Sequence, residues 1–340
     1  MSPVAVVILN YNGKALLKQF LPSVLRFSRQ ASIIVADNCS TDGSREFLSF
    51  EFPQVEVITI PSNLGFCAGY NYALRQVNAT YVVLLNSDVE VTPEWLPPLV
   101  ALLESDQQVG AVQPKILSYA NKGHFEYAGA GGGFIDWLGY PFCRGRIFNT
   151  LEADQHQYDD TLQVFWASGA CLALKAELFH KLGGFDEGFF AHMEEIDYCW
   201  RLKRAGHKVL YCGGSTVYHV GGATLSSSSP QKTYYNFRNG LAMLIKNLGP
   251  AKAVFTIPLR LVLDWLAAIK FLLTGNSRHA WAVVNAHVFL ILHFPSLLKK
   301  RHDLATTLQN YTVGQVYKKS IVLCYYLLQK KKFADPGRDQ

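Results

Sequence analysis

Acidic residues stand at two places in the sequence where a carboxylate could act chemically. At the first, the apolar stretch Tyr81–Leu85 runs directly into Asn86-Ser87-Asp88, so an expected strand delivers the Asp88 carboxylate to its end. Mg²⁺ or Mn²⁺ binds one or two carboxylates and fills its other positions with water and substrate phosphates. Asp88 is therefore a candidate metal ligand; the alternative is that it caps a helix starting near Pro93.

The second place is Glu194-Glu195-Ile196-Asp197, at the start of an expected helix. Asp197 can pair with Arg201 four residues later, which leaves Glu194 and Glu195 facing away from that pair. Clustered acids are one way to raise the pKa of a carboxyl group toward the range of a general base. A solvated helix N-terminus, where the helix dipole offsets part of the repulsion, is the alternative interpretation.

Polar residues also follow the first two expected strands. Val4–Leu9 ends in Asn10-Tyr11-Asn12-Gly13, which lacks the glycine fingerprint of NAD- or FAD-binding domains. Ile33–Ala36 ends at Asp37, whose carboxylate could accept a hydrogen bond from a nucleotide base or a ribose hydroxyl. As a single residue, Asp37 could equally be a turn or capping residue.

A sheet must position these residues. Four short apolar stretches alternate with helical patterns: Val4–Leu9, Ile33–Ala36, Val55–Ile60 and Tyr81–Leu85. This alternation predicts an α/β fold with a Rossmann-like, doubly wound, mostly parallel mixed sheet, in which ligands bind beyond the carboxyl ends of the strands. The Gly- and aromatic-rich residues 119–165 break the pattern, and we interpret them as an insertion that shapes the substrate site. Further strands are expected at Val164–Leu174 and Lys208–Cys212.

The composition changes at Ser226–Pro230, so we expect an α/β catalytic domain over residues 1–228 and a helical, basic region over residues 229–340. Residues 226–340 hold 16 Lys/Arg against 4 Asp/Glu, whereas residues 1–225 hold 16 against 22. The basic residues alternate with long apolar stretches. An anionic membrane surface therefore suits this region better than a nucleic acid.

Two apolar segments of this region, Val254–Thr274 and Ala280–Leu298, could form long helices. Each contains three polar residues: Arg260, Asp264 and Lys270 in the first, and Asn285, His287 and His293 in the second. Membrane-spanning segments rarely hold so many, so we expect helices that lie in the membrane interface. The expected anchors are Trp265, Trp281 and the basic clusters Lys299-Lys300-Arg301 and Lys330-Lys331-Lys332. The alternative is an apolar helical pair that packs on the catalytic domain or dimerises.

Cysteine usage and the N-terminus indicate the compartment. Seven cysteines are scattered without a CxxC pair, and the N-terminal sequence has neither a basic region nor a cleavage site typical of a secretory signal. We expect a reduced protein that attaches peripherally to the cytoplasmic face of a bacterial-type cell membrane. The sequence leaves the oligomeric state open.

Taken together, the sequence resembles the family 2 glycosyltransferases, inverting enzymes of the GT-A fold, and most closely their rhamnosyltransferase-like branch. The resemblance covers about residues 4–240 and rests on an ordered series of motifs: VVILNYNG, IIVADNCSTDGS, NLGFCAGYN, LLNSDVEV, WASGACLALK, GGFDEGFFAHMEEIDYCWRLKRAG and VYHVGG. It implies an enzyme that transfers a sugar, by single displacement, from a nucleotide-diphosphate sugar to a hydroxyl of a lipid-linked or polysaccharide acceptor.

The resemblance also implies roles for donor-binding residues and metal ligands. Asn10, Tyr11, Asn12 and Asp37 would bind the nucleotide base and ribose, and Asn63, Gly65 and Asn71 would belong to a loop that closes over the nucleotide. Asp88 matches the last acid of the Asp-X-Asp motif and His219 a downstream ligand of Mg²⁺ or Mn²⁺. Asn86 replaces the first acid of that motif, which would weaken metal binding or give Asn86 a contact with the sugar or ribose.

Two further motifs imply a catalytic base and a role for Arg238. Glu195 matches the catalytic base in the segment that usually reads Glu-Asp-X-Asp, with Glu194 as the alternative. Arg238 would meet a phosphate of donor or acceptor, or else lie on a helix that packs against the domain.

Two other functions stay open at this point. The Asn86 and Glu195 replacements are compatible with a membrane-tethered nucleotide-sugar-binding protein that lacks catalysis. A sugar-nucleotidyltransferase would also use an α/β sheet and a metal, but it predicts a Gly-rich, basic loop after the first strand, which NYNGK fits poorly.

Overall fold

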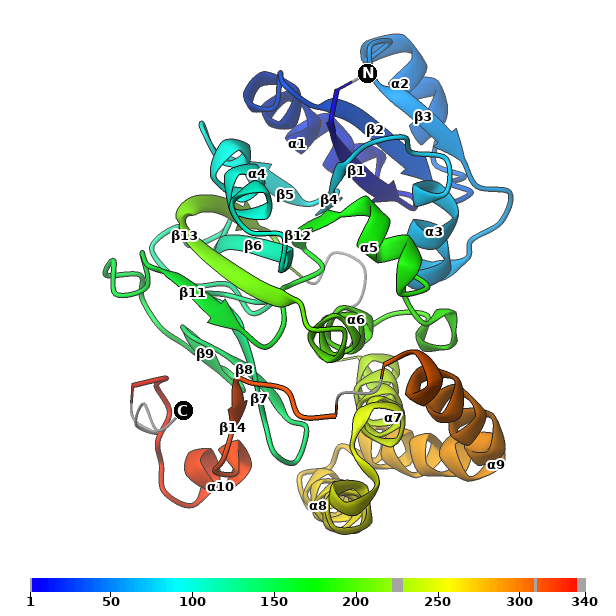
Figure 1. Ribbon diagram of the computed structural model, residues 1–340, viewed down its shortest axis with the longest axis vertical. Coiled ribbons are helices and arrows are strands. Elements are labelled where there is room, and N and C mark those ends of the chain that lie inside the picture. The colour runs from blue at the N-terminus through cyan, green and yellow to red at the C-terminus, as the bar shows by residue number, and fades with distance from the viewer. Residues whose placement is uncertain (1, 222–228, 309–310, 335–340) are drawn as a thin grey trace.

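The computed structural model describes residues 2–221, 229–308 and 311–334 of the chain. A nine-stranded mixed sheet forms the centre, in the order β11-β13-β6-β12-β4-β1-β2-β3, with β5 paired to β13 (Figure 1). Its strands are β1 (Val4–Asn10), β2 (Ser32–Asp37), β3 (Glu56–Thr59), β4 (Tyr81–Asn86), β5 (Val89–Val91), β6 (Val109–Ser118), β11 (Thr161–Val164), β12 (Cys171–Lys175) and β13 (Lys208–His219). The expected α/β fold with a mixed sheet is confirmed.

Strands β3, β2, β1 and β4 are parallel neighbours, because each connection carries a helix back across the sheet. Buried side chains alternate between the two faces, and helices cover both. One face packs against α1 (Lys14–Phe27), α2 (Ser44–Glu51) and α4 (Leu96–Ser105); the other packs against α3 (Gly65–Leu74), α5 (Ala176–Lys181) and α6 (Glu194–Arg204). The carboxyl ends of the strands therefore stay open to a ligand.

Two strand predictions differ from the structure. The expected strand Val164–Leu174 is two strands, β11 and β12, because Phe165 and Trp166 turn away to hydrogen-bond Gly133 of the insertion. The expected strand Lys208–Cys212 is only the first part of β13, which continues to His219 through a register shift between Cys212 and Thr216. Gly213 and Gly214 permit this bulge. Because they have no side chain, the apolar pattern that predicts a strand stops before them.

The irregular insertion folds into a second sheet, in the order β10-β9-β8-β7-β14. Its strands are β7 (Gly133–Asp136), β8 (Pro141–Cys143), β9 (Arg146–Ile147), β10 (Thr150–Leu151) and β14 (Val316–Tyr317). β14 comes from the C-terminal segment, and the following helix, α10 (Ile321–Tyr326), is tied to β7 by a hydrogen bond from Ile321 N–H to the Asp136 carboxylate (3.0 Å). The C-terminal segment thus returns to the catalytic part of the chain. The division at residues 228/229 borders residues 222–228, which lie outside the described residues, and it stays a prediction.

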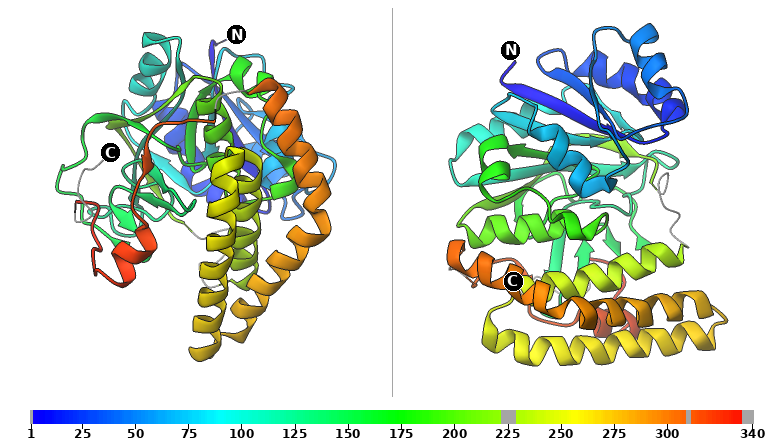
Figure 2. Two further views of the ribbon diagram at one scale, coloured as in Figure 1. Left: turned by 60° about the horizontal axis from the view of Figure 1, so that its bottom comes forward. Right: turned by 90° about the vertical axis from the view of Figure 1, so that its right-hand side faces the viewer.

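Three long helices follow: α7 (Pro230–Asn247), α8 (Pro250–Leu273) and α9 (Ser277–Thr307). Figure 2 shows them stacked beneath the sheet, with α7 next to α6 and α8 outermost. By length and composition, α9 is the one helix in the described part of the chain that could cross a membrane. A third of its most apolar stretch is buried inside the protein, so this composition is weak evidence of a crossing.

Buried polar side chains attach α8 and α9 to the insertion. Asp264 accepts hydrogen bonds from Arg260 (2.9 Å) and from the Tyr140 hydroxyl (3.2 Å), and His287 of α9 approaches its other oxygen. Arg260 also lies 3.7 Å above the Tyr140 ring. Arg260, Asp264 and His287, three of the six polar residues on which the prediction of interfacial helices is based, therefore point into the protein. The other three, Lys270, Asn285 and His293, are exposed.

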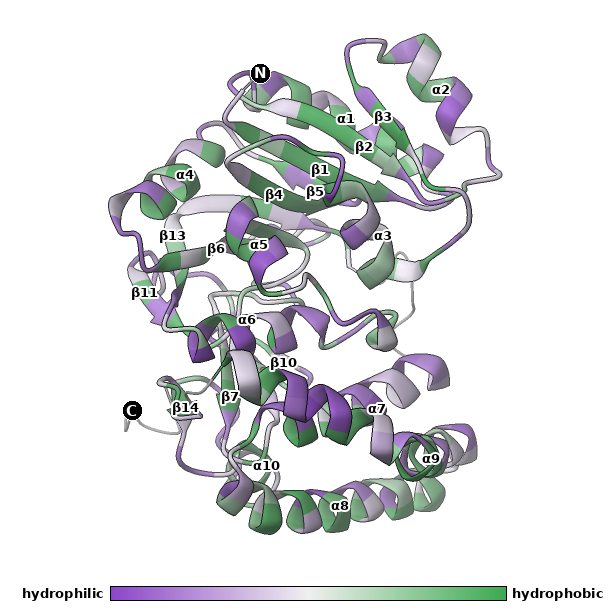
Figure 3. Ribbon diagram, turned by 45° about the vertical axis from the view of Figure 1, so that its right-hand side comes forward, coloured by the Kyte–Doolittle hydropathy of each residue, from purple (hydrophilic) through white to green (hydrophobic). Residues whose placement is uncertain are grey.

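The opposite side of these helices is apolar and exposed, and we call it the outer helix face. It comprises Val254, Phe255, Leu259, Val262, Trp265, Leu266, Ile269, Leu272 and Leu273 of α8, and Trp281, Val288, Ile291, Leu292, Phe294 and Leu298 of α9. Figure 3 shows the apolar colouring that dominates α8 along the edge of the molecule. Large exposed apolar patches on folded proteins often mark interaction sites, so the outer helix face is a candidate interaction surface.

Candidate active site

The carboxyl ends of β1 and β2 bring the first group of expected site residues together. Asn10 and Asp37 are register partners, and Asn10 Nδ2 donates to Asp37 Oδ1 and to Ser40 Oγ, both at 3.1 Å. Asn12 N–H donates to the same Ser40 hydroxyl, whereas Tyr11 is exposed. Within the described residues, the buried Asn10 Oδ1 atom has no hydrogen-bond partner. The group is thus a preformed hydrogen-bonded cluster at the strand ends, with one acceptor atom left without a partner.

Asn38, which the sequence analysis did not single out, extends this group to the next loop. Its amide donates to Asn63 Oδ1 (3.1 Å) and accepts from Leu64 N–H (3.0 Å). Gly65 follows with φ = 75°, and a Cβ atom there would lie 2.6 Å from the Phe190 ring, so only glycine fits. The loop that carries Asn63 and Gly65 therefore packs directly against the turn before α6.

Asn71 has a different environment from Asn63 and Gly65. It lies inside α3, where its side chain exchanges two hydrogen bonds of 2.9 Å with the main chain of Phe185. It also donates to Glu187. Asn71 thus joins α3 to Phe185 and Glu187 in the segment before α6, and this geometry gives no support to its predicted contact with a nucleotide.

Asp88 and His219 meet because β5 pairs with the end of β13, where Val89 is the register partner of His219. Asp88 Oδ1 lies 3.1 Å from His219 Nε2, and Asn86 Nδ2 lies 3.4 Å from the same nitrogen. On the other side of the imidazole, Nδ1 is 3.1 Å from Glu126 Oε2. Asp88 leads into β5, and α4 begins only at Leu96, so the structure gives Asp88 no helix-capping role.

His219 balances the negative charges of Asp88 and Glu126. Burial lowers the pKa of His219, but its close contacts with the Asp88 and Glu126 carboxylates outweigh burial and raise that pKa to about 10. The imidazole is consequently protonated near neutral pH when nothing else binds the two carboxylates. Glu126 lies in the irregular insertion, where no motif marked it.

The geometry of Asp88 and His219 fits a divalent metal. Two ligands at right angles and about 2.1 Å from one ion lie roughly 3 Å apart, close to the observed 3.1 Å. Glu126 would then orient the imidazole from behind. The described residues contain no group of three or more His, Cys, Asp or Glu side chains placed to hold a metal. Water and substrate phosphates would have to complete the coordination, which is the usual situation for Mg²⁺.

Glu194 and Glu195 stand at the start of α6, and within the described residues each has a buried Oε2 atom that lacks a hydrogen-bond partner. Burial raises the pKa of Glu195 to about 7. Burial and the neighbouring Glu195 charge raise the pKa of Glu194 well above its ordinary value. Gly169 leaves space beside Glu195, and its neighbour Ala170 accepts a hydrogen bond from Asn86 N–H. Glu195 therefore lies across Gly169 from the end of β4.

The turn before α6 is strained. Phe190, His192 and Met193 have φ values of 64°, 69° and 71°, in the left-handed region that side chains other than glycine rarely adopt. Helix α7 holds this turn: Asn239 Nδ2 donates to the carbonyl oxygens of Phe189, Ala191 and His192 at 3.1, 2.9 and 2.7 Å. We call residues 186–193 the catalytic turn.

Arg238 supports the same turn. Its guanidinium is buried and donates to the carbonyl oxygens of Gly188 (3.0 Å) and Phe189 (2.7 Å), and also to Asn239. These contacts favour the second of its two expected positions, on a helix that packs against the domain. The sequence motif around Arg238 and Asn239 was visible, but these carbonyl partners were not.

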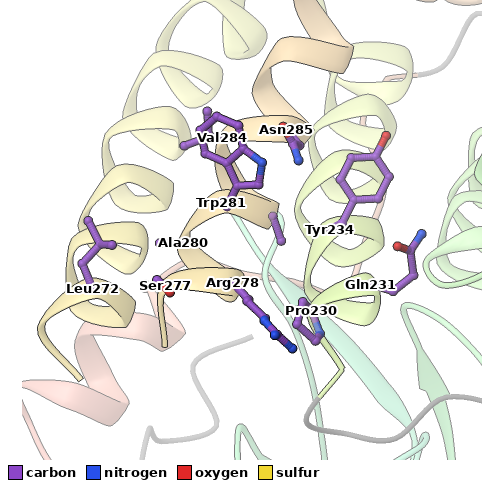
Figure 4. A pocket seen from close by; sticks show the side chains of 11 residues that line it. Pro230, Gln231, Tyr234, Leu272, Ser277, Arg278, Ala280, Trp281, Val284 and Asn285 are labelled. Carbon is purple, nitrogen blue, oxygen red and sulfur yellow. The ribbon is translucent and has the colours of Figure 1, made fainter. Parts of the chain in front are cut away.

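A groove of about 930 Å³ opens between the start of α7 and the junction of α8 and α9. Figure 4 shows Tyr234, Trp281, Leu272 and Arg278 among its walls. The Tyr234 ring lies 5.6 Å from that of Tyr235, which in turn stacks on Phe190 of the catalytic turn at 5.8 Å. Tyr234 of the groove wall is thus linked to Phe190, in the turn before α6, through the ring of Tyr235.

Comparison with characterised proteins shows related enzymes. The chain is 28% identical over 233 residues to the N-acetylglucosaminyl-diphospho-decaprenol L-rhamnosyltransferase of Mycobacterium tuberculosis, covering 63% of this chain and 75% of that protein. It is 25% identical to the low-salt glycan biosynthesis hexosyltransferase Agl10 of Haloferax volcanii, over 70% of this chain and 74% of that protein.

Solved structures share the fold. TarS of S. aureus, residues 1–349 in complex with UDP-GlcNAc, matches 93% of this chain and 99% of its own with a TM-score of 0.54 and 14% identity. The mannosyltransferase PcManGT from Pyrobaculum calidifontis, in complex with GDP-Man and Mn²⁺, matches 84% of this chain and 86% of its own, with a TM-score of 0.52 and 16% identity.

GalNAc-T7 with UDP, GalNAc and Mn²⁺ is a third neighbour, with a TM-score of 0.55 and 18% identity. The match covers 73% of this chain but only 48% of the GalNAc-T7 chain, about half of its length. These neighbours confirm the GT-A fold.

The family model for glycosyl transferase family 2 matches residues 5–183, more than half of the chain. The chain therefore belongs to glycosyl transferase family 2, and it is a glycosyltransferase.

Proposed function

We propose that this glycosyltransferase inverts the configuration of a sugar that it moves from a nucleotide-diphosphate donor to a hydroxyl group of a lipid-linked or cell-surface glycan. The pair of buried, unpaired carboxylate oxygens at the start of α6 carries this proposal. Unpaired buried carboxylates are costly, and a strained turn holds them in place. Such an arrangement suits a site that completes its hydrogen bonds only when substrate is bound.

Glu195 is the proposed base. A carboxyl with a pKa of about 7 is half deprotonated near neutral pH, whereas burial and the neighbouring Glu195 charge raise the pKa of Glu194 well above its ordinary value. Glu195 takes the proton from the acceptor hydroxyl as that oxygen bonds to the anomeric carbon. The bond from that carbon to the donor diphosphate breaks in the same step, so no covalent enzyme intermediate forms.

Donor binding is proposed at the carboxyl ends of β1, β2 and β4. Asp37 and the unpaired Asn10 Oδ1 atom would accept hydrogen bonds from base or ribose, and the loop through Asn63 would lie over the nucleotide. Asp88 and His219 would hold Mg²⁺ or Mn²⁺, provided that His219 loses its proton. The ion, when bound, would neutralise charge on the departing diphosphate. Two of the neighbouring structures contain Mn²⁺.

Residues 229–340 are the proposed membrane-associating region, lying on the cytoplasmic face of the membrane. The polar residues Arg260, Asp264 and His287 point inward, while Trp265 and Trp281 are 48% and 64% exposed on the outer helix face. This two-sided pattern is typical of helices that lie in an interface. Of the expected basic anchors, Lys300 pairs with Asp186 and Arg301 donates to Ile245, so both serve the protein interior as well.

The groove of Figure 4 is the proposed path of the acceptor. It has apolar walls from Leu272, Trp281 and Val284, and its wall residue Tyr234 contacts Tyr235, which stacks on Phe190 of the catalytic turn. An amphiphilic acceptor could therefore keep its lipid in the membrane while its sugar reaches Glu195.

Donor turnover tests the proposed chemistry. With a panel of nucleotide sugars and lipid-extract acceptors, wild type should turn over one donor in Mg²⁺ or Mn²⁺ and none in EDTA. Glu195→Gln should lose at least about a thousandfold in kcat with donor binding retained, because the base is removed but the nucleotide site is intact. Asp88→Ala should lose metal dependence and activity together. A Glu195→Gln enzyme at the normal rate, or donors that bind without any turnover by wild type, would contradict the proposal.

The pH profile tests the environment of Glu195. The base acts only when deprotonated, so kcat/KM should fall about tenfold per pH unit below a midpoint near 7. An ordinary glutamate would place this midpoint near 4.5. The measurement is initial transfer rates across about pH 5 to 9 at saturating metal, and a profile that stays flat down to about pH 5 would rule out Glu195 as the base.

Vesicle flotation tests the outer helix face. The double variant Phe255→Asp/Leu273→Asp changes side chains that are 77% and 83% exposed, so the fold should tolerate it. Binding to vesicles that contain phosphatidylglycerol should drop by at least about tenfold, since each lost apolar contact weakens insertion. Phe50→Asp, a change at an 83% exposed side chain on α2, is the matched control and should float like wild type. Equal flotation of all three proteins would exclude this face as the membrane contact.

A further inference from the structure

Arg146 is a buried cation that forms no direct salt bridge with a described residue, although the nearby Glu126 carboxylate raises its pKa. It lies in β9 of the insertion, is 6% exposed, and stacks over the Tyr127 ring at 4.4 Å. Its one side-chain hydrogen bond within the described residues goes to Cys143 Sγ (3.4 Å), and its buried Nε atom has no partner there. Arginine is costly to bury unless its donors are satisfied, so this guanidinium is incompletely paired.

Lys232 reaches the same tyrosine from α7. Its Nζ atom lies 5.3 Å from the centre of the Tyr127 ring, and the side chain is half-buried. Burial lowers the pKa of Lys232, as does the positive charge of Arg146, whereas Glu126 raises it. Lys232 also stands in the first turn of α7, where the helix dipole disfavours a cation. Neither helix stability nor an ion pair with a described residue explains its position.

The two cations lie beside the proposed catalytic groups. Glu126, which precedes Tyr127, contacts His219 and through it Asp88. On the other side, the charge of Lys232 acts on His192 of the catalytic turn, whose buried Nε2 atom also has no hydrogen-bond partner among the described residues. Arg146 and Lys232 therefore lie near Glu126, which contacts His219, and Lys232 also acts on the turn that precedes Glu195.

We infer that Arg146 and Lys232, which both lie over the Tyr127 ring, form an anion-binding site for a diphosphate group. A guanidinium offers planar, paired donors to phosphate oxygens, and an ammonium adds a mobile point charge. A doubly charged or more highly charged anion would offset the repulsion between the two cations, which a single carboxylate would do only in part. This site is separate from Asp88 and His219 and needs no metal.

The identity of the ligand rests on the proposed function. In a transfer between a nucleotide-diphosphate sugar and a lipid-linked glycan, the diphosphate can belong to the donor or to the link between the acceptor sugar and its lipid. The insertion and α7 supply the two cations, whereas β1, β2 and β4 supply the proposed donor site. Kinetics can separate the two sources.

Inorganic pyrophosphate in EDTA is the probe for the site itself, because its binding requires neither turnover nor metal. Calorimetry should show binding to wild type that weakens at least about tenfold in Lys232→Gln and in Arg146→Gln. Lys270→Gln is the matched control, since Lys270 also lies over a tyrosine ring (Tyr326, 4.4 Å) but on the exposed surface of α8. Thermal unfolding verifies that each variant is folded. Equal pyrophosphate binding by wild type and a folded Lys232→Gln protein would overturn the inference, whatever the transfer assay shows.

Steady-state transfer by Lys232→Gln then identifies the source. Two acceptors with the same terminal sugar are compared, one on a lipid diphosphate and one on an uncharged alkyl chain. A larger rise in KM for the diphosphate acceptor than for the alkyl acceptor assigns the site to the acceptor. A rise in the donor KM that is the same with both acceptors assigns it to the donor. If no KM changes with either acceptor, the site has no part in substrate binding and the inference is wrong.

Discussion

Lys246 bridges the two carboxylates that enclose the catalytic turn, and the geometry of the site depends on this bridge. Its Nζ atom lies 2.6 Å from Asp186 and 3.0 Å from Asp197, with only 2% of the residue exposed. Asp197 is also bound by Arg201 (2.9 Å) and Asn247 (2.8 Å). A lysine buried between two carboxylates fixes the end of α7 relative to α6 because breaking such a pair leaves an uncompensated charge. Both ends of a strained turn are thereby held by one side chain.

The acidic residues around this turn divide into two groups by their partners. Asp186 and Asp197 are buried but paired with cations, and these partners lower the pKa of both despite burial. Glu194 and Glu195 are buried without such partners, and the pKa of each is raised. Structural carboxylates that stay charged thus lie beside Glu195, whose carboxyl can change its protonation near neutral pH. That contrast is the physical basis for assigning the base to the unpaired group.

Sequence reasoning located the groups that follow regular strands. Asn10, Asp37, Asn86 and Asp88 were found because a run of buried β-residues ends immediately before them, and parallel strands place such ends at one edge of a sheet. Glu195 was visible through its motif.

Residues that reach the site from irregular or distant segments were not found. Glu126 and Arg146 lie in an insertion without periodicity, and the carbonyl partners of Asn239 lie nearly 50 residues upstream. Such contacts depend on the tertiary arrangement of α7 and the second sheet, which no local pattern encodes. The polar residues of α8 illustrate the same limit: their presence was plain, but only packing shows that Arg260 and Asp264 point toward the insertion.

The central claim is that α7 positions the catalytic base through main-chain hydrogen bonds to the catalytic turn. The most direct test is kcat and donor affinity in Asn239→Ala, with Asn236→Ala on the same helix as the control, since Asn236 makes no side-chain hydrogen bond within the described residues. Loss of three hydrogen bonds to strained backbone should displace Glu195 and reduce kcat about 10- to 100-fold, while the donor dissociation constant stays within about twofold. A folded Asn239→Ala enzyme with the wild-type kcat would contradict the account.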